Sequence, residues 1–557
     1  MRKFLSITLS ILLILTLTAC GNTASENPSN GDESNPAVSD AQKYQDLNNS
    51  SASGETGGTS SGGETNSGDG TAAGSQYGVA PIIPAKPATL MTDSEYHAKV
   101  DALTSSGGFE NVNSSYATEM DTLRNNLIAM IAYNSDSAKI SGTAYYVSNK
   151  GNDNNDGKTP ATAWATLDKV NTAELKPGDG VFFERSGLWR GGINAKKGVT
   201  YSAYGSGDKP RIFASIDGMT HGEWKQTSTP NVWVLDKVID ETDCGTIVFN
   251  DGEYFANKKQ AVEKLVANFD FVYTGNKSDA TKVDRKIYLY YDKGNPAECF
   301  KTIDITSARH LINFFEPNLS DVTIHNLDLA YGQDYYFTSN LKNITMSYCT
   351  VRWCGGAMFQ NQDIRAGGGG GAWENCDGLY FDHCYFYQHF DAGVSPQYQG
   401  SNPCVYKKFQ VTNCVFEKIE WVFEHWISVS EQTAAKSRWI DCKFAYNICY
   451  DTGGGFGDKM KRSSCVIGKA GAPVENCVIE KNIFDRSWYN SIIIDSNSSN
   501  SNDKYHFELK NNLYVIGRAN VTFATIWGVG YKATAAGFAD FVKLGIENNP
   551  TMKYINK

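Results

Sequence analysis

Apolar residues alternate with polar residues in a short pattern that recurs between Val322 and Ile516. Each copy has a central residue, with matching positions five and three residues before it and two after it. The copies read Val322, Ile324, Leu327, Leu329; Ile344, Met346, Cys349, Val351; Leu379, Phe381, Cys384, Phe386; Phe409, Val411, Cys414, Phe416; Ser437, Trp439, Cys442, Phe444; Cys477, Ile479, Asn482, Phe484; and Phe507, Leu509, Asn512, Tyr514. Ser437 is the polar exception. Such alternation predicts strands that bury one face.

The copies recur at unequal intervals of about one supersecondary unit, which is typical of a stack of repeated units with insertions of different lengths. We therefore expect an all-β fold, a right-handed parallel β-helix. In this fold each coil of the chain carries a short strand, and its inward residues stack on those of the next coil. Residues 141–557 are the predicted extent of this domain.

Four copies have a cysteine at the centre, namely Cys349, Cys384, Cys414 and Cys442. Successive coils lie about 4.8 Å apart, so these residues are expected to form an inward ladder that Asn482 and Asn512 continue. Disulfide geometry is demanding. We therefore interpret the ladder thiols as reduced and buried, acting as small hydrophobic side chains. The sequence does not pair the remaining cysteines of the region.

Helical spacing is found outside the repeats. It runs from Thr92 to about Leu103 and from Ser115 to about Tyr133, and the second stretch places Met120, Leu123, Leu127 and Met130 on one side. We expect residues 79–140 to form a small helical element that packs on the β-helix or caps it. A further helical stretch, from Ala533 to Leu544, is the expected C-terminal cap.

The N-terminus indicates export. A basic start is followed by an apolar run from Phe4 to Leu17, which is too short to be a stable membrane span. The run ends in Leu-Thr-Ala-Cys-Gly around Cys20, which resembles a bacterial lipobox. Residues 1–19 are therefore predicted to be a lipoprotein signal peptide and Cys20 to be the lipidation site.

Residues 20–78 consist mainly of Ser, Gly, Asn, Thr and acidic residues, a composition typical of a disordered tether. Together with the lipobox, this predicts an extracytoplasmic protein that is anchored by lipid to a bacterial membrane or cell surface, with no transmembrane helix in the mature chain. The net charge of −10 and the lack of a long basic run argue against nucleic acid as a partner. We expect a monomer.

The start of the β region carries further information. It contains Tyr-Tyr-Val-Ser from Tyr145, an Asn/Asp-rich loop between Gly151 and Gly157, Ala-Trp-Ala-Thr-Leu from Ala163, and Leu-Lys-Pro-Gly-Asp from Leu175. This run resembles the opening coils of secreted bacterial β-helix proteins of the pectate-lyase-like superfamily of carbohydrate-active proteins. The resemblance implies the fold and a polysaccharide substrate. It does not select a reaction, because several chemistries share this opening.

Three carboxylates follow the ladder residues at similar offsets: Asp391, Glu424 and Asp451. Similar offsets on neighbouring coils place them on one side of a β-helix. Retaining glycosidases hold two carboxyls about 5–5.5 Å apart and inverting ones about 6.5–9.5 Å apart, a range that one or two coil spacings cover. Glycoside hydrolysis by Asp391 and Glu424 is the preferred interpretation, with Asp451 in reserve and no cofactor. Each residue also fits a turn or a solvated coil edge.

The same segments contain side chains suited to binding a glycan. Aromatic rings stack on sugar faces, and basic groups bind hydroxyls or carboxylates. The predicted substrate-binding residues are Trp353, Arg365, His389, Trp421, His425, Trp426 and Lys459. Each histidine also fits a structural role.

Two other function classes remain open. In a polyuronate lyase, Lys459, Lys461 and Arg462 would supply the base and a substrate clamp, with Asp451 and Asp458 as calcium ligands. No tight acidic cluster with calcium spacing is present in the sequence, so this reading ranks second. In the third class, a lipid-anchored β-helix binds glycans or adheres to a surface without catalysis.

Overall fold

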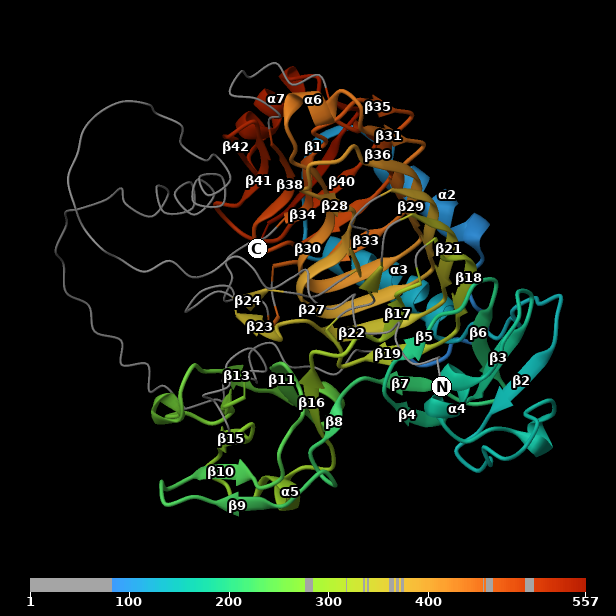
Figure 1. The fold of residues 1–557 in the computed structure, drawn as a ribbon. Helices are drawn as coiled ribbons and strands as arrows, with labels where there is room; N and C mark the ends of the chain where they lie inside the picture. The colour runs from blue at the N-terminus through green and yellow to red at the C-terminus, as the bar shows by residue number, and fades with distance from the viewer. Residues whose placement is uncertain are drawn as a thin grey trace, which may run out of the picture. The chain divides into compact units, whose positions relative to one another are not determined.

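The computed structural model describes residues 83–275, 284–316, 318–333, 336–337, 340–359, 365–366, 370–371, 375–453, 455–456, 464–495 and 505–556. The predicted signal peptide, the tether, Cys20, Asp458 and Lys459 lie outside these residues. Arg365 is described by its backbone alone. Over the described residues the protein is mostly β and contains two large, predominantly parallel sheets (Figure 1).

The first large sheet has 13 strands in the described part of the chain, and all of its paired strands run parallel. In chain order its strands are β2 (Ala144–Val147), β3 (Gly180–Glu184), β6 (Thr200–Tyr204), β18 (Ser320–His325), β21 (Leu341–Ser347), β26 (Cys376–Asp382), β29 (Val405–Thr412), β31 (Arg438–Ile440), β32 (Lys443–Ala445), β35 (Val474–Glu475), β36 (Val478–Glu480), β39 (Glu508–Lys510) and β43 (Glu547–Asn548).

The second large sheet has 17 strands among the described residues, and only its β41–β42 pair is antiparallel. Its strands are β1 (Gly108–Val112), β4 (Leu188–Arg190), β7 (Arg211–Phe213), β19 (Asp328–Ala330), β22 (Thr350–Cys354), β25 (Gly370–Gly371), β27 (Tyr385–Ser395), β28 (Gln397–Tyr398), β30 (Val415–Ile427), β33 (Ile448–Tyr450), β34 (Ser464–Lys469), β37 (Ile483–Asp485), β38 (Asn490–Ile494), β40 (Leu513–Ile516), β41 (Thr522–Ile526), β42 (Val529–Lys532) and β44 (Thr551–Ile555).

The chain passes from the first sheet to the second once in each repeat, and we call each such passage a coil. The corner between the sheets is made by a residue with positive φ, such as His383 (49°), Asn413 (55°) or Lys481 (54°). A second row of positive-φ residues, including Gln388 and Lys418, divides the second sheet into a first limb and a second limb. The long strands β27 and β30 run through both limbs.

The observed register confirms most of the predicted ladder. Val322 pairs with Ile344, which pairs with Leu379, which in turn pairs with Phe409. The prediction for the fifth copy was wrong. Gln410 pairs with Lys443 and Phe416 pairs with Cys449, so Cys414 lies opposite Asn447 rather than Cys442.

The correct fifth copy is therefore Cys442, Phe444, Asn447 and Cys449, shifted by five residues from the predicted one. The polar Ser437 was the sign of the error. Ile440, Cys442 and Phe444 alternate with polar residues, so the local pattern fits two registers. Only pairing with the neighbouring coil distinguishes them.

The side chains of the ladder accept backbone hydrogen bonds at the corners. The amide N–H of Cys384 donates to Cys414 Sγ at 3.4 Å, and the amide of Cys414 donates to Asn447 Oδ1 at 2.9 Å. Asn447, Asn482 and Asn512 continue this chain of bonds, which ends on Glu547 Oε1. All the cysteines whose side chains are described are free thiols. The ladder thiols are thus buried, as predicted; all four donate weak hydrogen bonds to backbone carbonyl oxygens, and Cys414 also accepts one.

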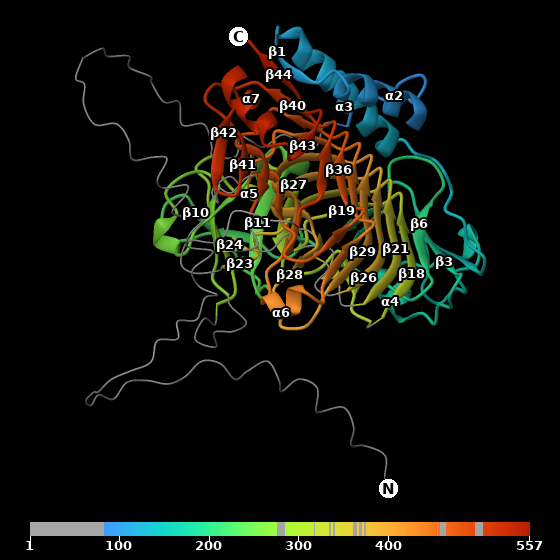
Figure 2. The same cartoon turned by 90° about the horizontal axis from the view of Figure 1, so that it is seen from above.

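Helices α2 (Asp93–Thr104) and α3 (Ser115–Ala132) lie close to the predicted ranges. Met120, Leu123, Leu127 and Met130 of α3 are buried. They join a second hydrophobic cluster that includes Tyr385, Val415, Ile483 and Leu513 on the outer face of the first limb. The two helices therefore cover that limb of the second sheet, and Figure 2 shows them along one side of the stacked strands.

The N-terminal segment is also joined to the C-terminal end of the sheet. Strand β1, between the two helices, pairs in parallel with β44 from Gly108–Thr551 to Val112–Ile555. Helix α7 (Ala535–Lys543) lies within the predicted C-terminal helix and buries Phe538 and Phe541 near the interior residue Phe523. None of the described helices combines the length and apolar character that a membrane span requires.

A smaller β module interrupts the early coils. Its strands are β8 (Ile216–Asp217), β9 (Trp224–Gln226), β10 (Val232–Leu235), β11 (Cys244–Phe249), β12 (Tyr254–Phe255), β13 (Asn257–Lys258), β14 (Asp270–Tyr273), β15 (Ile287–Tyr290) and β16 (Ile303–Ser307). They form two mainly antiparallel sheets around a separate hydrophobic cluster (Figure 1). Arg352 of the coils forms an ion pair with Asp251 of the module, which ties the two together.

Candidate active site

The outer face of the second limb carries Glu424, the first of the predicted carboxylates. Its neighbours Phe423 and Ile427 belong to the buried interior, whereas Glu424 is half-buried on the opposite face of β30. Ser395 Oγ donates to Glu424 Oε2 at 2.7 Å, and Gln397 Nε2 donates to Oε1 at 3.0 Å. Both donors belong to the preceding coil, so hydrogen bonds hold the carboxylate in a defined orientation.

Trp426 lies on the same face as Glu424, two residues further along β30. It is half-buried, and Lys469 Nζ of the next coil lies 5.5 Å from the centre of its ring. Gln397 pairs with Trp426 across the two coils. A carboxylate, an amide, an indole and an ammonium group therefore lie together on one outer face.

Asp391 is displaced along the strand from Glu424. It lies in an irregularity of β27, where the pairing shifts between His389 and Ala392. His389 pairs with Ile419 and Ala392 pairs with Trp421, so Phe390 and Asp391 together lie opposite Glu420. Glu424 is four residues beyond that point, about 13 Å along an extended strand. Asp391 and Glu424 have similar offsets from their ladder residues in the sequence, but they are not adjacent in the structure.

Glu420 is an acidic residue that the sequence reasoning passed over. It is 1% exposed, and it lies one coil from Asp391, opposite the irregularity of β27. The neighbouring Trp421 is half-buried, and its indole N–H is buried with no hydrogen-bond partner among the described residues. The sequence did contain a signal for Glu420. In the segment Glu420-Trp421-Val422-Phe423-Glu424, two acidic residues flank two aromatic ones.

On both coils that neighbour this position, the pairing with the sheet is interrupted and then resumes. On the preceding side, Cys354 pairs with His389, and the chain returns to the sheet at Gly370, which pairs with Val394. On the following side, Tyr450 pairs with Glu417, and the chain returns at Ser464, which pairs with Trp421. The insertions in the repeat therefore flank the position where Asp391 and Glu420 lie.

Asp451, the reserve carboxylate, is held by three neighbours. Lys418 Nζ lies 2.5 Å from Oδ2, and Trp488 Nε1 donates to Oδ1 at 2.6 Å. Arg518 lies 3.6 Å from Oδ1 and packs on the ring of Trp488, with 3.4 Å between its guanidinium carbon and the ring centre. This arrangement satisfies the carboxylate and links adjacent coils.

Trp353 was predicted to stack on sugar, but it is fully buried. It packs against Phe255, Tyr387 and Phe456 under the cover of the inserted module. Its ring therefore has no face open to a glycan. The sequence could not show this, because the covering residues come from distant segments.

His389 and His425 are also buried, with exposures of 0% and 1%. His389 contacts the carbonyl oxygens of Val351 and Ala392, and His425 packs against Phe507 with 4.4 Å between ring centres. Burial lowers the pKa of His389 to about 4 and that of His425 to about 3. Both rings are therefore neutral interior residues, and the prediction that they bind substrate is corrected.

Among the residues that the structure describes, no group of three or more His, Cys, Asp or Glu side chains is arranged to hold a metal ion. The calcium ligands proposed for a lyase, Asp451 and Asp458, are tested only in part, because Asp458 lies outside the described residues. The described partners of Asp451 are cations and an indole N–H.

No family model matches the chain, and no curated protein matches it. Solved structures with a similar course of the chain include a GH136 lacto-N-biosidase from Eubacterium ramulus, with 12% identity, 75% of this chain and 68% of that chain covered, and a TM-score of 0.34. A structure described as a glycoside hydrolase has 11% identity, coverages of 74% and 96%, and a TM-score of 0.37. An alginate lyase from Paenibacillus sp. str. FPU-7 has 10% identity, coverages of 70% and 96%, and a TM-score of 0.29. Likenesses this remote carry no argument about activity.

Proposed function

We propose that the protein is a polysaccharide-active enzyme built on a right-handed parallel β-helix, and that its reaction is glycoside hydrolysis on the outer face of the second limb. One observation carries this proposal. Glu424 is oriented by Ser395 and Gln397 on the same face as Trp426. An oriented carboxylate beside an indole is suited to a sugar, because the ring packs on the apolar sugar face while the carboxylate acts at the glycosidic bond.

The separation of Asp391 and Glu424 favours inversion over retention. The backbone places them about four residues apart along the strand and one coil apart across it. Of the two carboxyl separations, the inverting one of about 6.5–9.5 Å is nearer to this backbone distance than the retaining one of about 5–5.5 Å. In this scheme one carboxyl protonates the leaving oxygen and the other takes a proton from the attacking water.

The test is a screen of the chain from residue 79 onward against a panel of polysaccharides. A hydrolase releases reducing ends without ultraviolet absorbance. A lyase yields an absorbing C4–C5 double bond, and a calcium-dependent lyase loses this product when calcium is chelated. Retarded migration in an affinity gel without either product would indicate binding alone, and the hydrolase proposal would then be rejected.

Lyase activity is the second candidate, and Lys469 is the observation that favours it. Its ammonium group lies 5.5 Å from the ring of Trp426, on the coil that follows Glu424. A fixed cation at that point fits the carboxylate of a uronate residue. Lys459, the base suggested by sequence, lies outside the described residues. A substrate preference for uronates with reducing ends as the only product would favour hydrolysis of an acidic glycan instead.

We further propose that Cys20 anchors the protein to a bacterial membrane by lipid, with residues 20–78 as the tether. The support is the sequence of the first twenty residues. Replacement of Cys20 by Ala should move the protein from the membrane fraction to the soluble fraction after export. Retention of the variant in the membrane fraction would contradict the proposal.

A further inference from the structure

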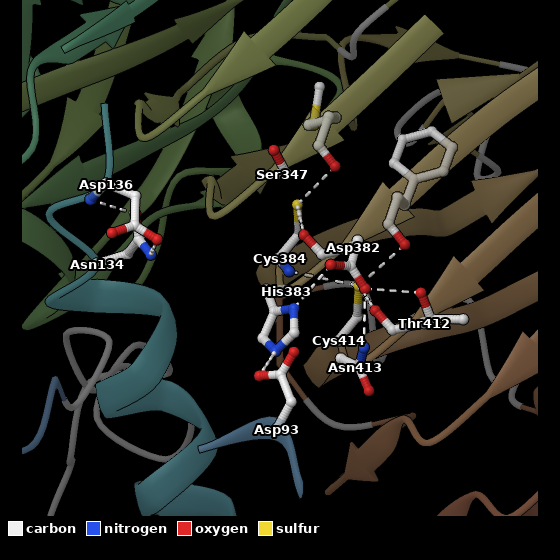
Figure 3. Close-up of polar contacts among 12 residues, drawn as sticks. Asp93, Asn134, Asp136, Ser347, Asp382, His383, Cys384, Thr412, Asn413 and Cys414 are labelled. Atoms are coloured by element: carbon white, nitrogen blue, oxygen red, sulfur yellow. Dashed lines mark hydrogen bonds and ion pairs between the residues drawn. The ribbon is translucent and has the colours of Figure 1, made fainter. Parts of the chain in front are cut away.

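A histidine links the N-terminal helices to a corner of the coils. His383 follows β26 and adopts positive φ. Its Nδ1 lies 2.8 Å from Asp382 Oδ2, and its Nε2 lies 3.2 Å from Asp93 Oδ1. Asp93 is the first residue of α2, so the imidazole lies between a carboxylate of the coils and a carboxylate of the helix, as Figure 3 shows.

The neighbours of His383 hold the ring in place. Tyr348, the positive-φ residue of the preceding coil, stacks on it with 4.7 Å between ring centres and an angle of 9°. Asp382 Oδ1 accepts hydrogen bonds from Thr412 Oγ1 at 2.7 Å and from Asn413 Nδ2 at 2.8 Å. The side chain of His383 is 1% exposed. Asp382 is therefore oriented independently of the histidine.

The charged surroundings of the ring are acidic. Asp382 comes from its own corner and Asp93 from α2, while Tyr348 and the neutral Thr412 and Asn413 come from the flanking coils. Burial by itself disfavours the charged ring, but hydrogen bonding and charge from Asp382, followed by Asp93, outweigh it and raise the pKa of His383. The same contact lowers the pKa of Asp382 against the effect of burial.

The protonation state decides how many contacts the ring can make. A protonated imidazole carries a positive charge and two N–H donors; it hydrogen-bonds Asp382 and forms an ion pair with Asp93, whose geometry is not that of a hydrogen bond. A neutral imidazole keeps one donor and turns a lone pair toward the other carboxylate. Because Asp382 is also fixed by Thr412 and Asn413, whereas Asp93 is 56% exposed, the contact to Asp93 is the one expected to be lost.

We propose that His383 is a proton-operated latch that holds the first turn of α2 on the coils and releases it when the ring loses its proton. The next contact between α2 and the coils is a hydrogen bond of 2.8 Å that Tyr96 Oη donates to the carbonyl oxygen of Tyr446. A further tie joins Asp101 Oδ1 to Lys481 Nζ at 2.8 Å. Neither needs a histidine, and the contact of His97 Nε2 with Asn413 Oδ1 at 2.7 Å can be made by a neutral ring, which keeps one N–H donor. Release is therefore confined to the start of α2 and the segment before it, while the rest of the helix stays docked.

Hydrogen exchange of the full chain, measured by mass spectrometry on peptides covering α2, tests the latch. The wild type is compared with H383Q at the same pH, so the intrinsic pH dependence of exchange cancels. At pH 5.5 the amides at the start of α2 should exchange at least fivefold more slowly in the wild type than in H383Q. At pH 8.5 the two proteins should exchange at similar rates. Peptides at the end of α2 should not differ.

Two further variants make the result specific. D93N removes the charge on the helix side and should behave like H383Q at pH 5.5. H97Q alters a histidine of the same helix that contacts Asn413 Oδ1 at 2.7 Å and should keep the pH-dependent difference. Equal protection in wild type and H383Q at pH 5.5, or a ratio that does not change with pH, would overturn the latch. The same effect in D93N would also show that the change in H383Q does not come from a folding defect of that variant.

Discussion

Ser395 donates a 2.7 Å hydrogen bond to Glu424 on the next coil. This contact crosses from β27 to β30 on the outer face of the second limb, where Gln397 supplies a second donor. Parallel pairing brings the two strands together from sequence positions about one coil apart. The position of Glu424 is thus a property of the stack and cannot be read from its own segment.

Replacement of Glu424 by Gln should lower the rate of glycan cleavage about 10²- to 10⁴-fold, the usual contribution of a positioned acid or base. The amide keeps the size and one acceptor of the carboxylate, so the melting temperature should change little. Release of reducing ends is the measurement. E480Q is the matched control, because Glu480 is a half-buried carboxylate on the first sheet that pairs with Lys443 and Lys510. Full activity of E424Q would exclude Glu424 from the chemistry.

Trp426 and Trp439 should respond differently to replacement by Ala. Trp426 is half-buried on the outer face, so its loss should weaken glycan affinity with little effect on stability. Trp439 is fully buried and donates from Nε1 to the carbonyl oxygen of Ala470 at 2.7 Å. Its loss should cost about 3–5 kcal/mol of unfolding free energy. Affinity electrophoresis and urea unfolding separate the two effects, and a stable W426A with unchanged affinity would contradict the assignment.

The asparagine ladder makes a prediction about stability. Asn482 Oδ1 accepts from the backbone N–H and the side chain of Asn447, and Asn482 Nδ2 donates to Asn512 Oδ1 and the carbonyl of Phe444. Asn482→Ala leaves several buried groups without partners, which should cost about 2–4 kcal/mol in urea unfolding. Cys414→Ala removes only the weak hydrogen bonds of a thiol and should cost less. Equal losses would show that the ladder acts through packing alone.

Glu547 should make the stability of the fold depend on pH. Burial raises its pKa to about 7, despite hydrogen bonds from Tyr514 and Asn512 that favour the charged form. The folded protein therefore binds this proton more tightly than the unfolded chain does, and stability falls as the pH rises from the usual glutamate range to about 7. E547Q should remove this slope and raise the unfolding free energy at pH 8 by roughly 1–3 kcal/mol. An unchanged slope would mean that another group is responsible.

The N-terminal helices should be required for folding of the β region. Leu127 is fully buried against the first limb, and L127A should cost about 2–5 kcal/mol. A chain that begins at residue 141 exposes the outer cluster of the first limb and should be aggregation-prone. Circular dichroism and size-exclusion chromatography check both variants. A soluble, cooperatively folding fragment from residue 141 would show that the helices are dispensable.

Several elements could be predicted from local sequence. Alternation around Ile344 and Met346 predicts an inward strand face, because neighbouring residues in a strand point to opposite sides. The spacing of Met120, Leu123 and Leu127 likewise predicts one buried side of a helix. These patterns come from backbone geometry within one element, so the sequence alone suffices for them.

The candidate site was predicted less well. Trp353, His389 and His425 have ring side chains in the same region of the sequence as half-buried Trp426, but they lie inside the protein. Exposure depends on which distant segment packs on a residue. Phe255 of the inserted module covers Trp353, for example, and nothing near Trp353 in the sequence shows this.

The sequence by itself determined which segments form strands and helices, because period-2 and helical spacing are local properties of the chain. Only the tertiary structure decided that Asn447 rather than Cys442 continues the ladder, and that Phe390 and Asp391 lie opposite Glu420. Both depend on the register between coils. Insertions of uneven length separate the coils, so register is set by hydrogen bonding and stacking between strands that are remote in sequence.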